Sequence, residues 1–334
     1  MPVTVRSYAK INFGLYVGPP RADGFHGLRT VYQTIALHDI IRVSVVRGEG
    51  IEIRSKDPRV PCDATNTCYR VAERAMAALR ARSKVIIEIE KQLPVQGGLG
   101  GASGNAVATL LALERALKKQ LSGDEKLRIA AEVGSDLPLF LMGGTSLGVG
   151  RGEEVYPLPD LPSVPCVIAT PKVGVSTPQA FADWDALMGT GNPQTSNKLT
   201  LSRPSDRISV FSRVISAWLN GFQLKTGKAI TGVPVSKGRG RAENPLLDLV
   251  RTGIENDFEK VVFPQYPDLR DVKNAFVKAG AYYASLSGSG SALYGLFHSR
   301  TAAQKAVAKL SKSGIPAIAT ATLTRQQYWK RMFD

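Results

Sequence analysis

Residues 94–102 form a glycine-rich segment between a predicted strand and a predicted helix that runs to about Leu117. Such a loop exposes backbone N–H groups, and the N-terminus of the following helix adds a partial positive charge. Together they favour an anion, typically a phosphate group. The segment lacks the Gly-Lys-Ser/Thr ending of a Walker loop and the acidic residue that completes a dinucleotide-binding fingerprint. A phosphate site and a plain turn therefore both remain open.

Three further segments carry groups that could act with this loop. Lys10 and Asn12 lie two residues apart in an apolar predicted strand, so both side chains share one face. A lysine there needs an anionic partner, although an edge-strand lysine that prevents aggregation has the same pattern. Asp136, two residues before Pro138, suits a catalytic carboxylate, but taken alone it favours a turn or helix cap. The Ser/Gly segment 287–291, taken alone, favours a tight hairpin.

The elements that must position these residues form two blocks. The first has predicted strands at 3–17, 31–36, 40–46 and 85–90, helices at 67–82, 102–117 and from 122, and short strands after residue 138. The second has predicted strands at 166–170, 282–286, 292–297 and 317–323, and helices from 176 and at 207–219, 245–251, 256–262, 269–279 and 301–312. This pattern predicts an α+β fold with mixed or antiparallel sheets. Four prolines in 157–165 separate the blocks and predict domains 1–160 and 161–334.

Composition and charge narrow the functional classes. The 334 residues are 43% hydrophobic, which suffices for a core, and no run of about 18 apolar residues is present. No secretory signal is visible, and the scattered Cys62, Cys68 and Cys166 disfavour both a disulfide framework and a four-thiolate zinc site. A reducing cytoplasm fits this pattern best.

The net charge of +15 is compatible with nucleic acid, an anionic membrane surface or a phosphorylated small molecule. Residues 190–241 carry nine of the basic residues and one acidic residue, so this predicted insertion holds about half of the excess. It could be a lid, a partner site or a solvated loop. An RNA-binding module is one alternative for the whole chain, but the interleaved aromatic and basic residues typical of single-strand platforms are missing.

The order of the four segments is more specific than any one of them. It resembles the GHMP kinases and, within them, the family of 4-diphosphocytidyl-2-C-methyl-D-erythritol kinases. The similarity covers residues 5–180 almost continuously and resumes at about 244–300. The segment Asp23–His26 distinguishes this family from other GHMP kinases. The matching segments are 9–13, 21–26, 94–110, 134–140 with Gly143 and Gly144, and 287–291.

The resemblance implies a two-domain GHMP kinase fold, with a ribosomal protein S5 domain 2-like N-terminal domain and a ferredoxin-like α/β C-terminal domain. It implies ATP-dependent phosphorylation, with Mg²⁺, of the 2-hydroxyl of 4-diphosphocytidyl-2-C-methyl-D-erythritol in the non-mevalonate isoprenoid pathway. The expected partners are ATP and this cytidine diphosphate derivative, with no membrane or nucleic acid, in a monomer or homodimer. Another GHMP kinase, acting on homoserine, mevalonate or a sugar, is the nearest alternative.

The resemblance also implies roles for particular residues. Asp136 matches the aspartate that accepts the hydroxyl proton, and Lys10 matches the lysine beside it. Asn12 would bind the substrate near Lys10, and His26 would hydrogen-bond the cytosine. Phe25 and Phe181 would cover the two faces of that base, with Thr177 beside Phe181. The expected ATP-binding residues are Pro94, Gly97, Gly98, Leu99, Gly100, Gly101, Ala102, Ser103 and Gly104, and Ser103 is also a possible metal ligand.

Two positions depart from the family pattern. Gly104 stands where relatives commonly have a serine that could contact phosphate or Mg²⁺, and Asn105 stands where they have an aspartate. These departures predict a weaker Mg²⁺ site and raise the alternative of a catalytically silent paralogue. The presence of both Lys10 and Asp136 argues against that alternative.

Overall fold

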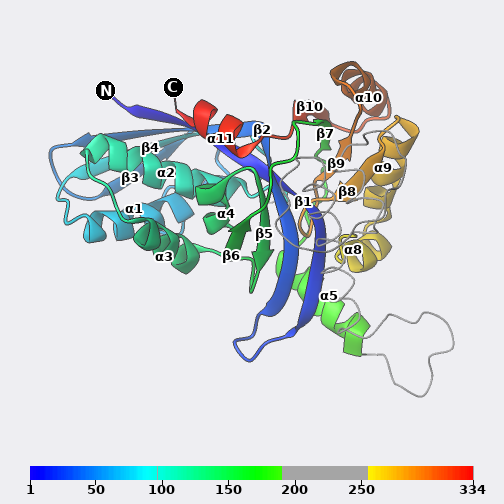
Figure 1. Cartoon of the computed structure of the whole chain (residues 1–334), viewed down its shortest axis with the longest axis horizontal. Helices are drawn as coiled ribbons and strands as arrows, with labels where there is room; N and C mark the ends of the chain where they lie inside the picture. The colour runs from blue at the N-terminus through cyan, green and yellow to red at the C-terminus, as the bar shows by residue number, and fades with distance from the viewer. Residues whose placement is uncertain (96, 190–254, 334) are drawn as a thin grey trace, which may run out of the picture.

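The computed structural model describes residues 1–95, 97–189 and 255–333, and it contains two sheets joined by long strands (Figure 1). The first sheet has the order β3-β4-β2-β5-β6, and β1 pairs with β2. Every pairing in it is antiparallel except β3 with β4. Its strands are β1 (Val3–Pro20), β2 (His26–Val46), β3 (Ile51–Ser55), β4 (Lys84–Glu90), β5 (Thr145–Val149) and β6 (Glu154–Pro157).

Four helices pack against this sheet and bury its first core (Figure 1). They are α1 (Thr67–Ala78), α2 (Gly101–Leu117), α3 (Gly123–Val133) and α4 (Leu137–Met142). Helix α2 is the central one, because its residues from Gly104 to Glu114 are all buried. Ser122 caps α3 by accepting a hydrogen bond from the Glu125 N–H, as the sequence predicted for that helix start.

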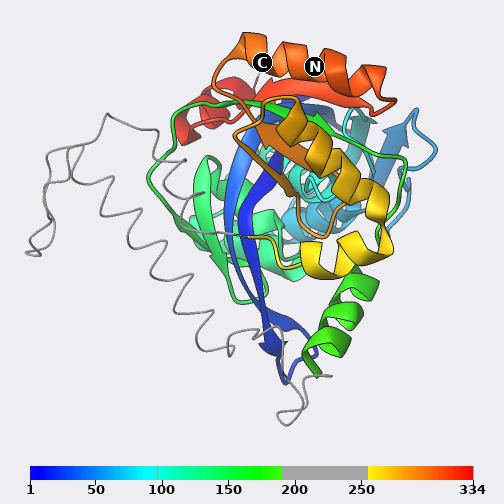
Figure 2. The ribbon, with the colours of Figure 1, turned by 90° about the vertical axis from the view of Figure 1, so that its right-hand side faces the viewer.

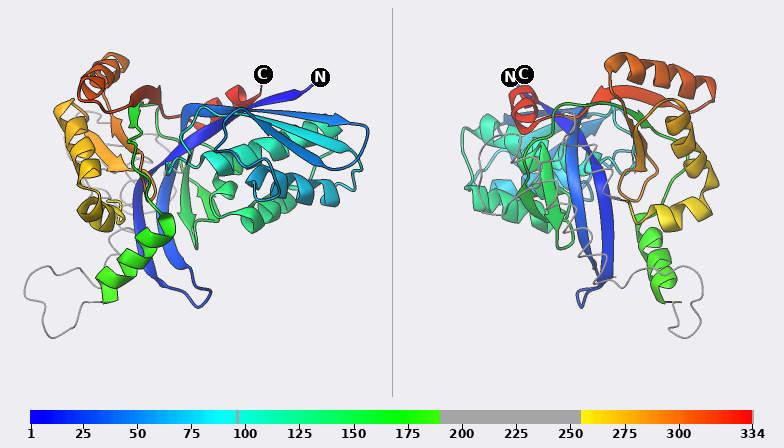
Figure 3. Two further views of the ribbon diagram at one scale, coloured as in Figure 1. Left: turned by 180° about the vertical axis from the view of Figure 1, so that it is seen from behind. Right: turned by 45° about the vertical axis from the view of Figure 1, so that its right-hand side comes forward.

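The second sheet has the order β10-β7-β9-β8 and is antiparallel throughout. Figure 2 shows α9 and α10 covering it, with α8 below them. Helix α5 lies beside the outer end of the β1–β2 hairpin in both Figure 1 and Figure 3. The elements are β7 (Pro165–Ala169), α5 (Thr177–Gly189), α8 (Glu259–Gln265), α9 (Pro267–Lys278), β8 (Tyr283–Leu286), β9 (Leu293–Leu296), α10 (Arg300–Lys312) and β10 (Ala317–Ala321).

Strand β1 contributes to every part of the interior. The outer half of β1 packs in the second core, which the second sheet and its helices form. A smaller cluster joins the middle of β1 to β7 and β9 through Ile11, Phe13, Ile168 and Tyr294. At its C-terminal end the chain returns from the second sheet, and α11 (Arg325–Met332) packs in the first core. Both termini therefore lie at the same edge of the molecule (Figure 3). The crossing between sheets falls between β6 and β7; the domain division at 160/161 stays a prediction.

Several predicted elements differ from the structure. The strands expected at 31–36 and 40–46 form one strand, β2, because His38 and Asp39 between them pair with Tyr8 and Ser7 of β1, next to a register shift that leaves 36 and 37 without β1 partners. Residues 137–142 form a helix rather than a strand, and Pro138 stands in its first turn, where proline is tolerated. Strand β3 and helix α11 were not expected. The insertion 190–241 and the helices expected at 207–219 and 245–251 lie outside the described residues.

Among the described residues, none of the helices has the length and apolar character needed to cross a bilayer.

Candidate active site

Lys10 and Asp136 meet at the junction of β1 and α4. The Lys10 Nζ lies 3.6 Å from Asp136 Oδ2, and the lysine side chain is 4% exposed whereas the aspartate is 35% exposed. Lys10 sits in the middle of β1, and Asp136 is the N-cap residue of α4 without capping it through its side chain. The buried lysine therefore has the anionic partner that its position requires, and the carboxylate keeps one side open to the cavity.

Asn12 fixes the lysine and connects it to the Ser/Gly loop. Its Oδ1 accepts hydrogen bonds from Lys10 Nζ at 2.9 Å and from the Gly288 N–H at 2.9 Å. Its Nδ2 donates to Thr30 Oγ1 at 2.8 Å, which settles the orientation of the amide. The bond to Thr30 uses one of the two Nδ2 hydrogens, and Asn12 also lines the cavity that contains Lys10 and Asp136, so its contact with substrate stays a prediction.

Tyr32 is a site residue that the sequence did not indicate. Its hydroxyl donates to Asp136 Oδ1 at 3.2 Å from the neighbouring strand β2. Burial, and then the nearby Asp136 carboxylate, raise the pKa of Tyr32 well above its usual value, so the hydroxyl stays a donor. The glycines of the β5–β6 hairpin make room for its ring, because a Cβ on Gly148 would overlap it.

The glycine-rich loop lies between Lys10 and the Ser/Gly loop. Its carbonyl groups bond inward: Leu99 O accepts from the Lys10 N–H at 2.9 Å, and Gly98 O accepts from Ser287 Oγ at 2.9 Å. Gly98 has φ +71° and a Cβ there would overlap the Ser287 carbonyl oxygen. Gly100 has φ +70° and a Cβ there would lie 2.9 Å from the Phe140 ring. Only glycine fits at these two positions, and the N–H groups at the start of α2 remain available.

A cavity of about 340 Å³ opens over this loop. Every predicted ATP-binding residue except Gly104 lines it, together with a wall from 59–67 and Lys91 that the sequence did not indicate. Gly104 faces the opposite way, since a Cβ there would lie 2.9 Å from both Ser7 Oγ and Tyr8 O. The structure therefore does not place Gly104 in the phosphate cradle, and a serine side chain would have no space at this position.

Asn105 lines the cavity over the loop, and its amide nitrogen is held by a buried carboxylate. Its Nδ2 donates to the buried Asp39 Oδ2 at 2.9 Å, so an aspartate at 105 would bring a second carboxylate against Asp39. The weaker Mg²⁺ site stays a prediction: Gly104 faces Ser7, whereas Asn105 lines the cavity and its buried Oδ1 accepts no hydrogen bond from the described residues. Among the described residues, moreover, three or more His, Cys, Asp or Glu side chains nowhere gather into a metal cluster.

A second cavity of about 740 Å³ contains the lysine–aspartate pair and the predicted base-binding residues. The His26 ring stacks on Phe181 with centroids 4.8 Å apart, and its Nε2 lies 2.7 Å from Asp185 Oδ1. Phe25 is half exposed at the rim. Thr177 Oγ1 bonds Ser289 Oγ at 2.7 Å, which joins α5 to the Ser/Gly loop. All four predicted base-binding residues, Phe25, His26, Thr177 and Phe181, line this one cavity.

Arg151 is a further cavity residue that the sequence did not indicate. It lies in the β5–β6 hairpin, and its guanidinium stands 4.9 Å from the centre of the Phe25 ring. Glu153 Oε1 accepts from its Nε at 3.0 Å, which leaves the end of the guanidinium at the cavity. The only signal in the sequence is a lone basic residue between two glycines, which is too common a pattern to indicate a site.

Comparison with known proteins agrees with this geometry. The GHMP kinases N terminal domain model matches residues 66–144, and the GHMP kinases C terminal model matches residues 242–316. The 4-diphosphocytidyl-2-C-methyl-D-erythritol kinase of Solibacter usitatus is 36% identical over 98% of this chain and 92% of its own length. A crystal structure of 4-(cytidine 5'-diphospho)-2C-methyl-D-erythritol kinase aligns with a TM-score of 0.69 and 27% identity over 96% of this chain and 98% of that chain.

A homoserine kinase structure from Cytophaga hutchinsonii has a TM-score of 0.66 at 21% identity, covering 97% of this chain and 96% of that chain, which shows the shared fold alone. The fold is therefore the two-domain GHMP kinase fold, and the chain is a small-molecule kinase that uses ATP. The identity over nearly the whole length is more specific than the fold. This chain belongs to the 4-diphosphocytidyl-2-C-methyl-D-erythritol kinase family of the GHMP kinases.

Proposed function

We propose that this protein transfers the γ-phosphate of ATP to the 2-hydroxyl of 4-diphosphocytidyl-2-C-methyl-D-erythritol, the step that its relatives would serve in isoprenoid biosynthesis. One observation carries the proposal. The Lys10–Asp136 pair and the aromatic residues Phe25, His26 and Phe181 line a single cavity next to the glycine-rich loop. A substrate with a pyrimidine at one end and a hydroxyl at the other can span that cavity.

The proposed step needs one proton acceptor and one neutralising cation. The hydroxyl oxygen attacks the γ-phosphorus, the bond from phosphorus to the β,γ-bridging oxygen breaks, and ADP leaves with that electron pair. Asp136 takes the hydroxyl proton, since it is the carboxylate of the pair that reaches the cavity. Lys10 stays bonded to Asn12 and opposes the negative charge on the transferred group. Positioning and charge neutralisation supply most of the rate enhancement in such reactions.

The phosphates of ATP would lie on the N–H groups of Gly101, Ala102 and Ser103, where the start of α2 favours an anion. The purine would occupy the 340 Å³ cavity beside this loop. A bound Mg²⁺ would offset the charge of the β- and γ-phosphates, with the Ser103 hydroxyl as its protein ligand.

His26 and Asp185 would read the base together. Because Asp185 holds Nε2 of His26, the ring is fixed in place and its Nδ1 is left for the pyrimidine edge. The carboxylate itself is 44% exposed and can accept from an exocyclic amine, a group that cytosine has and uracil lacks. Arg151 would meet the diphosphate. We expect the active species to be a monomer or a homodimer, divided into domains near residue 160.

A substrate panel tests the proposed function. Purified protein with ATP and Mg²⁺ should phosphorylate the cytidyl substrate in a coupled assay, with little turnover of homoserine or mevalonate and reduced turnover of the uridyl analogue. Comparable activity with homoserine or mevalonate would replace the proposal with another GHMP kinase activity. Salt-dependent RNA binding without kinase activity would replace it with a binding module.

A matched pair of histidine variants tests the base-binding half. His26→Ala should raise KM for the cytidyl substrate about tenfold or more and leave KM for ATP unchanged. His298→Ala is the control, because that exposed histidine stacks on Tyr282 and does not line the 740 Å³ cavity. Equal effects in the two variants would exclude His26 from base recognition.

A further inference from the structure

Asp136 stands at the beginning of a helix too short to hold itself in place. Helix α4 has six residues, and an isolated helix of that length is unstable in water. It ends at Gly143 and Gly144, which both have positive φ. The direction of this helix, and with it the position of Asp136, must therefore be set by neighbouring elements.

Helix α11, some 190 residues further along the sequence, is hydrogen-bonded to the C-terminal end of α4. The Tyr328 hydroxyl donates to Phe140 O at 2.6 Å, and the Trp329 Nε1–H donates to Met142 O at 3.2 Å. Both acceptors are carbonyl groups of the last helical turn, which have no partner within the helix. Burial raises the pKa of Tyr328 well above its usual value, so its hydroxyl remains a donor. The two helices are thus bonded side chain to backbone.

The fit between the two helices depends on Gly143. A Cβ at that position would overlap the Tyr328 ring, which is 1% exposed. Helix α11 begins with a capping box between Thr324 and Gln327, so its own start is well fixed.

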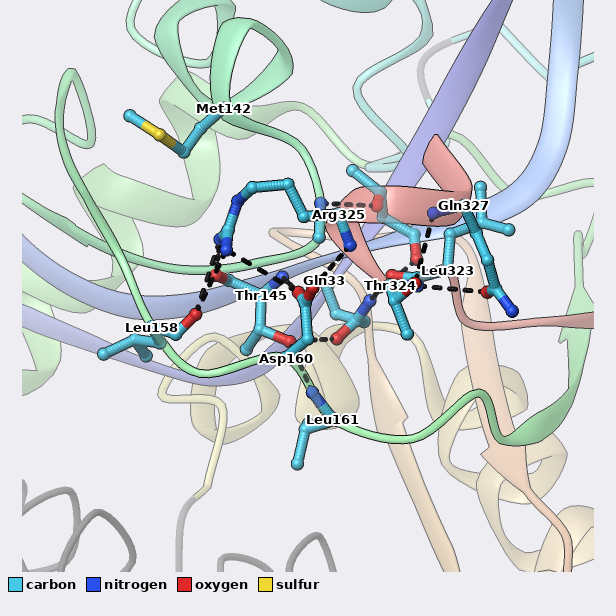
Figure 4. A network of polar contacts seen from close by, with 12 residues as sticks. Gln33, Met142, Thr145, Leu158, Asp160, Leu161, Leu323, Thr324, Arg325 and Gln327 are labelled. Atoms are coloured by element: carbon cyan, nitrogen blue, oxygen red, sulfur yellow. Dashed lines mark hydrogen bonds and ion pairs between the residues drawn. The ribbon is translucent and has the colours of Figure 1, made fainter. Parts of the chain in front are cut away.

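A polar network anchors α11 to the first sheet. Arg325 donates from its backbone N–H to Asp160 Oδ2 at 2.7 Å and from its guanidinium to Thr145 O at 2.7 Å (Figure 4). Gln33 of β2 joins the same network by donating to Leu323 O at 2.7 Å (Figure 4). Helix α11, which is hydrogen-bonded to α4, is therefore itself held against the sheet that carries Lys10.

Helix α4 touches both halves of the chemistry. Asp136 at its start faces Lys10, and Phe140 in its last turn packs against Gly100 of the phosphate loop. A shift of α4 would move the proton acceptor and the loop together. Small misplacements of reacting groups are costly, because the rate depends on near-attack geometry.

We propose that Tyr328 and Trp329 are positioning residues for phosphoryl transfer, acting through the C-terminal end of α4 on Asp136. This inference rests on the proposed role of Asp136 as proton acceptor. Neither residue lines either cavity, and both lie beyond the segments that the two family models match.

The test compares two tyrosine-to-phenylalanine variants. Tyr328→Phe keeps the ring and removes only the hydroxyl, and we expect kcat to fall about tenfold while KM for ATP and for the cytidyl substrate changes less than twofold. Tyr8→Phe is the matched control, because the Tyr8 ring packs beside that of Tyr328 but its one O–H donates to Arg331 O of α11, at 3.0 Å, rather than to a carbonyl of α4. Trp329→Phe should show the same split of kcat from KM with a smaller fall.

Amide hydrogen exchange provides a readout that needs no turnover. Tyr328→Phe should speed exchange in α4, including the Gly143 N–H that bonds Leu139 O, whereas Tyr8→Phe should leave it unchanged. An unchanged kcat in Tyr328→Phe, or equal losses in both variants, overturns the proposal while the proposed function stands. If the wild-type protein phosphorylates no acceptor, the proposed function fails, and exchange alone decides whether α11 fixes α4.

Discussion

Two lysine–aspartate pairs lie on opposite sides of the glycine-rich loop. Lys10 with Asp136 adjoins Gly100, and Lys91 with Asp39 adjoins Gly101. Asp39 is fully buried and accepts from four donors: Lys91 Nζ, Asn105 Nδ2, and the N–H groups of Gln92 and Leu93. Asp136 is partly exposed and accepts from Tyr32 while facing Lys10 at 3.6 Å.

The difference supports a structural role for the Lys91–Asp39 pair and the proposed reactive role for the Lys10–Asp136 pair. Each oxygen of Asp39 accepts two hydrogen bonds, so this carboxylate has little capacity left for a substrate proton, and it ties the end of β4 to the first turns of α2. Asp136 keeps lone pairs that point toward a cavity and only loosely contacts its lysine. The two pairs have the same residue types. Asp136 differs in that its carboxylate has free hydrogen-bonding capacity and adjoins a cavity.

The largest effect is expected from Asp136→Asn. The amide cannot take the hydroxyl proton, so kcat should fall by about 10²–10⁴-fold, the usual contribution of a general base. Unfolding free energy and ATP affinity should be close to wild type. Steady-state kinetics measure kcat, and calorimetric titration measures the affinity for ATP. Near-normal turnover in Asp136→Asn would exclude Asp136 as the proton acceptor.

The same substitution in the other pair should act on stability instead. Asp39→Asn leaves the Lys91 ammonium buried without an anion, which costs about 3–5 kcal/mol of unfolding free energy. Denaturant unfolding measures that loss. If Asp39→Asn unfolds no more easily than Asp136→Asn, the contrast between the two pairs is wrong.

A smaller effect is expected from Tyr32→Phe. It removes the hydrogen bond to Asp136 Oδ1, and kcat should fall about threefold to tenfold, or about 0.7–1.4 kcal/mol of barrier. KM values should hold, since the hydroxyl acts on Asp136. A change confined to KM would mean that Tyr32 binds substrate rather than orienting the carboxylate.

The smallest expected effect is a loss of unfolding free energy at alkaline pH. The folded pKa of Tyr32 is raised, so its contribution to stability is complete below the unfolded pKa near 10 and is lost as the pH rises above it. Between pH 9 and 10.5, wild type should lose more unfolding free energy than Tyr32→Phe, by on the order of 1 kcal/mol or less. Equal losses would show that Tyr32 is not desolvated in the folded protein.

The parts of the site that the sequence predicted are local in the chain. The glycine-rich loop and the placing of Lys10 with Asn12 on one face each depend on a few neighbouring residues. The segment at 23–26 was indicated by family resemblance, and the structure places its residues 24–26 in the cavity with Asp136. These features need no knowledge of which strands pair.

The remaining parts depend on distant contacts. Tyr32, Asp185 and Arg151 reach the cavity only because β2, α5 and the β5–β6 hairpin meet there, and their sequence neighbourhoods are ordinary. Gly104 was assigned to the phosphate cradle by its place in the loop, yet the turn of α2 directs it toward Ser7. Successive residues of a helix face different directions, so a difference of one position decides whether a residue faces the cavity or the core. Packing of the helix against its neighbours sets that orientation.

The return of the chain to its first sheet has a consequence for the timing of synthesis. Proteins leave the ribosome from the N-terminus, and early segments begin to fold before late ones appear. Lys10 and Asp136 are both synthesised before the midpoint, but Val5 bridges Phe333 and Phe140 is bonded by Tyr328. If Lys10 and Asp136 act as proposed, a nascent chain can bring this pair together long before residue 329 emerges, and it gains its full activity only then.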